Sequence, residues 1–469
     1  MRKPAIVRPA RGFGNRRDGR APAQGCPGGG CCAEPGAVAP LPPLGVCAYV
    51  DPMRFIHAAD LHLDSPLRGL ARYEGAPVQR LRTATRGALE RLIDLALAQP
   101  VDFLLLAGDI YDGDWQDFHT GLFFREQLAR LNRAGIRVFM IQGNHDAQGV
   151  ISRKLVLPPN VTVFDSRSAH TARLDDLGVA IHGRSFRDRA EDADLVPAYP
   201  PPVPGLFNIG LLHTSLSGRP GHDTYAPTTV DTLVAKGYDY WALGHVHCRE
   251  LVRETPRIVF PGNLQGRHAN ETGPKGCELV RVEAGHIAAE CVPLALVRWD
   301  QLRLDLTGMD RLESLGAAFR EALVPRLAGA GDLLHAVRVT LTGCTGLYAL
   351  EAERPGTLEA NIRAAAQDVA AAEVWIEQVR VDLTPPLDRE QMARREDAMG
   401  ELVRLVDALH GSPGALADLA QTQLGGLLNA LPPEVAGDEV PRLDRTADLL
   451  DLLRDAEATV LARLAAAQP

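Results

Sequence analysis

The sequence predicts an α/β fold in a large first region, followed by a small α+β domain and C-terminal helices. Three observations support this prediction. Apolar strand-like runs alternate with helical patterns from residue 53 to about residue 290, polar clusters follow strand after strand, and the pattern changes beyond residue 290. At 469 residues the chain is too long for one ordinary hydrophobic core, so two or three domains are expected.

The first 52 residues differ in composition from the rest of the chain. They are rich in Gly, Pro and Ala, and carry seven Lys or Arg against three acids. They lack hydrophobic periodicity, and no apolar segment follows Arg16 and Arg17 as a secretory signal requires. We predict a disordered tail. Alternatively, translation begins at Met53, where a strand-like run starts at once, and residues 1–52 reflect a mis-annotated gene start.

Net charge and cysteine usage limit the class of protein. Beyond residue 52 the chain has 43 basic and 56 acidic residues, so global charge gives no support for a nucleic-acid partner. No apolar run approaches the roughly 18–20 residues needed to span a membrane. The later cysteines are scattered singly and no export signal precedes them, which suits reduced thiols in the cytoplasm: Cys248, Cys277, Cys291 and Cys344.

From residue 53 onwards the pattern predicts a βαβαβ unit. The run "RFIHAAD" leads to a helix over roughly residues 78–99, and "VDFLLLAGD" returns as a buried strand. A second helix, about residues 117–134, leads into "IRVFMIQGNHD". This alternation favours a largely parallel sheet between helices.

Further strands are expected downstream, at residues 207–213 and 238–247, with shorter ones near residues 178–182, 257–260 and 277–282. Ligands of open α/β sheets bind at the carboxyl ends of the strands, where this chain places its polar clusters. We therefore expect the functional site at that edge.

The polar clusters have the side chains of a metal site. In order they are Asp60-x-His62, Gly108-Asp109-x-x-Asp112, Gly143-Asn144-His145-Asp146, His213 and Gly244-His245-x-His247. Carboxylate, imidazole and amide oxygen ligands suit Mn²⁺, Fe²⁺ or Zn²⁺, and the lack of cysteine argues against a closed structural zinc site. Seven ligands are too many for one catalytic metal. These seven ligands would suffice for two metal ions about 3.5–4 Å apart that share one bridging carboxylate.

Each cluster also has an ordinary structural interpretation. Asp60 and His62 alone would be a turn with a capped helix, and the acids of GDxxD would complement a helix dipole. His213 alone would be a histidine at the edge of the core. The GHxH pair is stronger evidence, because two histidines after a strand-ending glycine have little packing value. Five clusters in this order, each after an apolar run, make coincidence remote.

In these five motifs and their order the chain resembles the calcineurin-like metallophosphoesterase superfamily. The resemblance covers residues 53 to roughly 290, and implies a sandwich of mixed sheets flanked by helices in a nuclease domain over residues 53–292. The segments "HAADLHLDSP", "DYWALGHVH" and "PGNLQGRHANETGPKG" are similar to bacterial DNA repair exonucleases of the SbcD and YhaO type, and more closely to the latter.

The resemblance implies a role for each site residue. One metal would be held by Asp60, His62 and His247, and the other by Asn144, His213 and His245, with Asp109 bridging them. His145 would stabilise charge on the phosphate or protonate the leaving oxygen, and Asp112 would orient His145. The two ions would be Mn²⁺ foremost, with Fe²⁺ or Zn²⁺ as alternatives. The implied activity is DNA exonuclease or phosphodiesterase chemistry in which a metal-bound hydroxide attacks phosphorus.

Residues 261–276 follow the last metal motif and are rich in glycine. They hold four candidate contacts to a phosphodiester backbone: Asn263, Arg267, His268 and Lys275. The alternative is a solvated loop before the next strand.

The pattern of residues 296–385 predicts the small α+β domain. "LVRWDQLRLDLTG", "LLHAVRVTLTG" and "VWIEQVRVDLTP" are strand-like, with helices expected at about residues 310–326 and 357–372. In SbcD-type nucleases a comparable domain caps the core and helps to select DNA ends, so the same role is expected here by analogy.

Residues 386–469 are Leu/Ala-rich and acidic, with 8 basic and 15 acidic residues. Two helical stripes are present, one formed by Leu402, Val403, Val406 and Leu409, the other by Leu449, Leu450, Leu453, Val460, Leu461 and Leu464. They either pack within the chain or dock a partner. The resemblance implies an SMC-like coiled-coil ATPase of the SbcC or YhaN type, and also allows a homodimer through the phosphoesterase core.

Two other functions use the same residues. A small-molecule phosphodiesterase, for example for cyclic nucleotides, would need the same metals, but about 180 residues after the core argue against such a minimal enzyme. A non-catalytic DNA-tethering subunit of an ATPase complex would have no physical need for His145.

Overall fold

The computed structural model describes residues 52–65, 75–112, 118–147, 155–218, 225–327, 331–369, 373–386, 389–430 and 442–466. Apart from Pro52, the tail predicted to be disordered lies outside these residues. Among the described residues, no helix combines the length and the apolar character that a membrane crossing requires.

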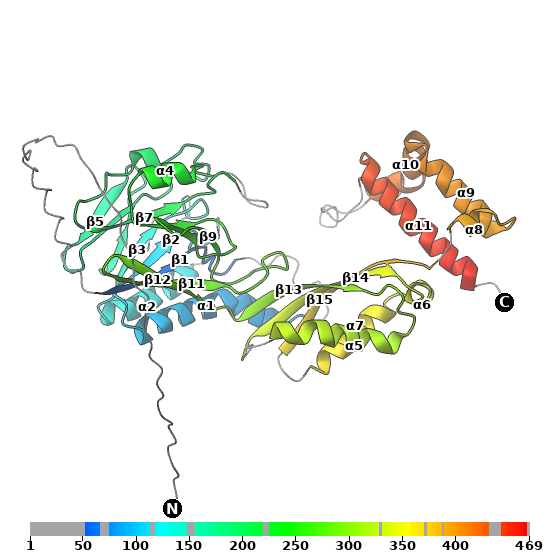
Figure 1. Cartoon of the computed structure of the whole chain (residues 1–469), viewed down its shortest axis with the longest axis horizontal. Coiled ribbons are helices and arrows are strands. Elements are labelled where there is room, and N and C mark those ends of the chain that lie inside the picture. The colour runs from blue at the N-terminus through cyan, green and yellow to red at the C-terminus, as the bar shows by residue number, and fades with distance from the viewer. Residues whose placement is uncertain are drawn as a thin grey trace, which may run out of the picture. The chain divides into compact units, whose positions relative to one another are not determined.

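The first region, residues 53–293, contains two six-stranded sheets (Figure 1). The first has the order β12-β11-β1-β2-β3-β4, formed by β12 (His286–Pro293), β11 (Gly276–Glu283), β1 (Met53–Ala58), β2 (Phe103–Ala107), β3 (Arg137–Ile141) and β4 (Val161–Val163). The second has the order β5-β6-β7-β8-β10-β9, formed by β5 (His170–Leu174), β6 (Val179–Gly183), β7 (Phe207–His213), β8 (Tyr240–Gly244), β10 (Arg257–Phe260) and β9 (Glu250–Arg253).

Both sheets are mixed. The strands β1 to β4 are parallel to one another, whereas β11 and β12 are antiparallel to their neighbours. In the second sheet the strands β6, β7, β8 and β10 are parallel, and β5 and β9 are antiparallel edges. The predicted mixed sandwich is confirmed. Periodicity favoured a single, largely parallel sheet, but the strands form two sheets. Periodicity could not distinguish these arrangements, because a strand that is buried on both faces has the same run of apolar residues in either one.

The two sheets pack face to face over an apolar layer that includes Phe55, Phe103, Phe139, Ile209 and Tyr240. The helices α1 (Val78–Ala98) and α2 (Phe118–Arg133) cover the outer face of the first sheet. The helix α4 (Val230–Ala235) and the 3-10 turn η2 (Val196–Ala198) lie outside the second. The central strands β1, β2, β3, β7 and β8 are therefore buried on both faces, which fixes the strand ends where the functional groups lie.

One polar cluster crosses the apolar layer between the sheets. His57 is fully buried, with Nδ1 3.1 Å from the hydroxyl of Tyr240 and Nε2 3.1 Å from the carbonyl oxygen of Leu243. Because a carbonyl only accepts, Nε2 carries the proton and Nδ1 accepts from Tyr240. Burial lowers the pKa of His57 to about 4.

This lowered pKa predicts a loss of stability in acid. Below pH 6.5 the unfolded chain binds a proton at His57 that the folded protein excludes, so the free energy of unfolding falls between pH 6.5 and about pH 4. The expected contribution is about 3 kcal/mol. Urea unfolding of wild type and His57→Gln at pH 7 and pH 5 should show a smaller pH dependence in the variant. Parallel pH curves would assign the acid sensitivity to other groups.

The middle region is a three-stranded parallel sheet of β13 (Val297–Asp305), β14 (Leu334–Cys344) and β15 (Glu373–Thr384). The helices α5 (Leu312–Leu323) and α7 (Thr357–Gln367) cover one face, and α6 (Leu347–Glu353) and the turn η3 (Val324–Leu327) complete the unit. Near the start of β13 and β15, Trp299 and Trp375 pack with Leu81 and Ala84 of α1 and with Ala269. This contact anchors residues 265–271 to both domains.

The C-terminal region is helical, with α8 (Arg389–Ala393), α9 (Ala398–His410), α10 (Pro413–Asn429) and α11 (Thr446–Ala466). Much of the two predicted stripes packs within this region, since Val403 and Leu461 share one cluster and Leu449 belongs to another. Val460 is exposed. Other large apolar side chains are also exposed here, namely Leu405, Leu419 and Leu427.

Candidate metal centre

The ends of five strands place the predicted ligands at one edge of the sandwich. Asp60 and His62 follow β1, Asp109 follows β2, and Asn144 follows β3. His213 ends β7, and His245 and His247 follow β8. The two sheets meet here, because Nδ1 of His213 lies 2.8 Å from the carbonyl oxygen of Ala107 at the end of β2.

The ligands lie on turns after the strands. Asp60, His62, Asp109 and His245 have φ values of 52°, 42°, 51° and 101°, in the left-handed region. The strand predicted over residues 238–247 is shorter than expected, because β8 ends at Gly244 and His245 and His247 lie beyond it. Non-glycine residues in this conformation are uncommon and gather at functional sites, where the surrounding structure holds them.

Three glycines allow these turns to approach one another closely. A Cβ on Gly143 would lie 2.2 Å from Oδ1 of Asp109, and one on Gly244 would lie 2.0 Å from the carbonyl oxygen of Ala107. Gly108 has a φ of 93° and would place a Cβ 2.6 Å from Nδ1 of His213. Glycine is therefore required in the GDxxD, GNHD and GHxH motifs for steric reasons.

On one side of the centre, Asp60, His62 and His247 offer donor atoms that all lie within 4.8 Å of one another. Nε2 of His62 lies 3.2 Å from Nε2 of His247. Nδ1 of His247 lies 2.7 Å from Oε1 of Glu271, and a carboxylate beside Nδ1 holds the proton there. Nε2 of His247 then presents a lone pair to His62, an arrangement that a cation between the rings would stabilise.

On the other side, Asp60, Asp109 and His213 form a second group of donor atoms within 4.8 Å. Nε2 of His213 lies 3.0 Å from Oδ1 of Asn144 and 3.4 Å from Oδ2 of Asp109. The ring of His245 lies 5.3 Å from that of His213, centroid to centroid, and 5.6 Å from Tyr225. His245 therefore borders this group without belonging to the tight clusters of donor atoms.

The electrostatics of the cluster fit divalent cations. Burial lowers the pKa of His62 to about 3, so its ring is a neutral ligand at neutral pH. Burial opposes charge on Asp109, but His213 and His62 hold its pKa below the usual range. The pKa of His213 rises to about 9 because Asp109 outweighs its burial. With Nδ1 donating to Ala107, the extra proton of His213 occupies Nε2, the position that a metal ion would take.

His145 and Asp112 form the second functional pair. Nδ1 of His145 lies 3.0 Å from Oδ1 of Asp112, and a third of the His145 side chain is exposed. Burial would lower the pKa of His145, but Asp112 and Asp109 raise it above 6.5. His145 also offers a donor atom near His62 and Asp109, so distance alone would admit it as a ligand. Its contact with Asp112 and its exposure favour the predicted role toward substrate.

Two predicted DNA contacts do not fit the structure. Asn263 is fully buried, and its amide donates to the carbonyl oxygen of Gln265 and to Glu271. Lys275 is 4% exposed, and its Nζ donates to the carbonyl oxygen of His247 at 2.6 Å. Both side chains stabilise the loop and the GHxH turn from within. From the sequence alone, a polar side chain in this glycine-rich segment could not be assigned either to hydrogen bonds within the protein or to contacts with a ligand.

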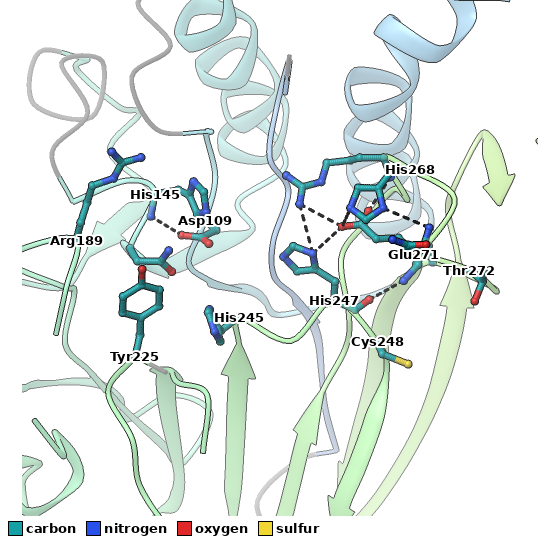
Figure 2. A pocket seen from close by; sticks show the side chains of 14 residues that line it. Asp109, His145, Arg189, Tyr225, His245, His247, Cys248, His268, Glu271 and Thr272 are labelled. Atoms are coloured by element: carbon teal, nitrogen blue, oxygen red, sulfur yellow. Dashed lines mark hydrogen bonds and ion pairs between the residues drawn. The ribbon is translucent and has the colours of Figure 1, made fainter. Parts of the chain in front are cut away.

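The other two candidates, Arg267 and His268, line an open cleft of about 790 Å³ in front of the metal ligands (Figure 2). Arg189 and Tyr225 lie on one side of the cleft, and His268 and Thr272 lie on the other. Arg189, Arg267 and His268 line it together with Asp109 and Glu271, and the buried Lys275 borders it with Nζ bonded to the carbonyl oxygen of His247. Such a cleft attracts anionic substrates through its local field.

Two carboxylates that sequence reasoning missed also belong to the site. Glu271 contacts His247, as described above, and Asp146 accepts hydrogen bonds from the backbone amides of Ile110, Tyr111 and Gly143. The position of Asp146 within the GNHD motif is a signal that could have identified it. Nothing in the sequence distinguishes Glu271 from the other polar residues of its loop.

Comparison with known proteins identifies two families along the chain. Residues 53–249 match the calcineurin-like phosphoesterases, and residues 299–384 match the middle domain of metallophosphoesterase YhaO. The uncharacterized metallophosphoesterase YhaO of Bacillus subtilis is 36% identical over 334 residues, which cover 70% of this chain and 81% of that protein.

Two other similar proteins each match about half of the chain. The DNA double-strand break repair protein Mre11 of Methanopyrus kandleri is 27% identical over 229 residues, covering 45% of this chain and 48% of that protein. A dimetal phosphatase from Danio rerio, known from its crystal structure, aligns with 51% of this chain and 99% of that chain at 12% identity and a TM-score of 0.30. From the two matched families and the extent of its similarity to YhaO, the chain belongs to the YhaO-type calcineurin-like metallophosphoesterases.

Proposed function

We propose that the protein is a metal-dependent DNA exonuclease that hydrolyses phosphodiester bonds with two divalent ions. One observation carries the proposal: two groups of metal-donor atoms share Asp60 and lie beside the His145–Asp112 pair, and Asp109, His145 and His247 of this cluster open into one cleft that also holds Arg189 and Arg267. Membership in a phosphoester hydrolase superfamily supports the reaction type. Similarity to a protein named for DNA double-strand break repair supports DNA as the substrate.

Each residue of the site has a distinct role in the proposed reaction. Asp60, His62 and His247 would hold one ion, and Asn144, His213 and His245 the other, with Asp109 between them. Bound divalent ions would supply a water that is deprotonated near neutral pH and would neutralise phosphoryl oxygens. His145, whose pKa is raised, holds a proton that can pass to the leaving sugar oxygen. Asp112 keeps that proton donor oriented toward the cleft.

The form of the cleft favours a polymer over a small ester. It is open, with Arg189 on one side of the metal ligands (Figure 2) and Arg267 on the other, beside His247 and Glu271. Phosphates on both sides of the reacting group would find cations there, whereas a cyclic nucleotide has only one phosphate. We propose DNA ends as the substrate for this reason.

A nuclease assay tests the proposal. End-labelled linear duplex and covalently closed circular DNA are incubated with the full chain and Mn²⁺, beside bis(p-nitrophenyl) phosphate, a cyclic nucleotide and a chelator control. We expect progressive loss of the linear DNA, protection of the circle, and no reaction with chelator. Hydrolysis of the small esters without DNA cleavage would favour a small-molecule phosphodiesterase. Binding of DNA without any hydrolysis would favour a tethering subunit.

The proposed partners are DNA, a second copy of the chain, and an SMC-like coiled-coil ATPase at the C-terminal helices. The exposed apolar side chains Leu405, Leu419, Leu427 and Val460 support docking of a protein there. The excess of acids in residues 386–469 argues against docking of DNA at the same surface.

A further inference from the structure

A second carboxylate network lies behind the metal ligands and centres on Glu271. The residue is buried, its carboxylate lies within hydrogen-bond distance of four donors, and Nε2 of His268 lies 3.5 Å from Oε1. Oε1 lies 2.7 Å from Nδ1 of His247 and 3.1 Å from Nη2 of Arg267. Oε2 accepts from the amide of Asn263 at 2.9 Å and from the backbone N–H of Arg267 at 2.7 Å. All four groups can donate, and a carboxylate is the side chain that accepts from all of them.

Arg267 connects this carboxylate with the one that orients His145. Its Nη1 lies 3.7 Å from Oδ2 of Asp112, and Asp112 in turn contacts His145. The guanidinium therefore lies between two carboxylates, each of which contacts a histidine of the site.

We infer that Glu271 is a positioning residue that fixes His247 as a ligand of the metal ion beside Asp60 and His62. A carboxylate at Nδ1 keeps the proton on that nitrogen, so Nε2 always presents its lone pair, and the ring cannot rotate. The inference deepens the proposed function, because it depends on the same metal centre. Asn144 and His213, on the other side, have no contact with Glu271 among the interactions of the described residues.

The substitution Glu271→Gln tests this role with little change of shape. Glutamine has one acceptor oxygen and one NH₂ group, so whichever way the amide is turned, its NH₂ faces two donors. We expect about 10–100-fold weaker binding of one Mn²⁺ ion and unchanged binding of the other. Titration of the full chain with Mn²⁺, with free Mn²⁺ counted by electron paramagnetic resonance, measures both sites without any substrate.

Gln265→Ala is the matched control for a merely structural effect. Gln265 belongs to the same loop and is buried, but its side chain bonds to the backbone of Gly266, Leu296 and Val297 rather than to a metal ligand. The substitution Gln265→Ala should lower the melting temperature and leave the affinity of both sites for Mn²⁺ unchanged. If Glu271→Gln binds two ions as wild type does, or if Gln265→Ala weakens binding equally, the positioning role is refuted. If wild type binds two ions but cleaves no DNA, the proposed function fails while the role of Glu271 stands.

Discussion

Replacement of His145 by alanine is expected to slow phosphodiester hydrolysis by about 10²–10⁴-fold while both metal ions stay bound. His145 is the exposed member of the cluster, its pKa is raised, and Nδ1 lies 3.0 Å from Asp112. These features suit a proton donor to the leaving oxygen. Removal of the ring therefore removes a proton transfer, and Asp60, Asp109 and His213 keep their donor atoms together.

Single-turnover cleavage of end-labelled DNA and a Mn²⁺ titration measure the two halves of this prediction separately. Asp112→Asn is the companion variant, because Asp112 raises the pKa of His145 against the effect of burial. We expect the rate to decline at high pH, where His145 loses its proton, and this decline should move to lower pH in Asp112→Asn. Loss of a metal ion from His145→Ala would instead identify His145 as a ligand, as its distance to His62 and Asp109 allows.

The sequence predicted the family and the fold class because both depend on local patterns. Five short motifs after apolar runs identify the superfamily, and the confirmed sandwich follows from that resemblance. Hydrophobic periodicity alone predicted one largely parallel sheet, because a strand covered on both faces shows no alternation that would assign it to one of two sheets. The left-handed turns at Asp60 and Asp109 were also invisible to periodicity, since they depend on packing between loops.

The loop at residues 261–276 shows where prediction from the sequence stops. Four of its polar residues were assigned to one outward role, but two of these, Asn263 and Lys275, point inward. Glu271, which was given no role, contacts His247. The direction of each side chain is decided by tertiary contacts, such as the hydrogen bond from Trp299 to the carbonyl oxygen of Gly266. No single-sequence pattern encodes such contacts, which here join residues 24 to 33 positions apart.

Replacement of Asp109 by asparagine is expected to have the largest effect on metal binding. Asp109 Oδ2 lies 3.8 Å from Nε2 of His62 and 3.4 Å from Nε2 of His213, so it is placed to serve both sides of the centre. Oδ1 also accepts the backbone N–H of His145. Loss of the bridging charge leaves Asp60 as the only carboxylate in either ligand set, so we expect hydrolysis to fall by at least about 10³-fold.

Thermal unfolding with and without Mn²⁺ tests this expectation independently of activity. A ligand that binds only the folded state raises the melting temperature, so wild type should gain stability with Mn²⁺ and Asp109→Asn should gain little. Asp146→Asn is the matched control, because Asp146 is equally buried but accepts backbone amides and is in none of the groups of donor atoms. It should unfold at a lower temperature yet keep its response to Mn²⁺. An undiminished response in Asp109→Asn would show that Asp109 does not bridge the ions, because a bridging ligand cannot lose its charge without weakening both sites.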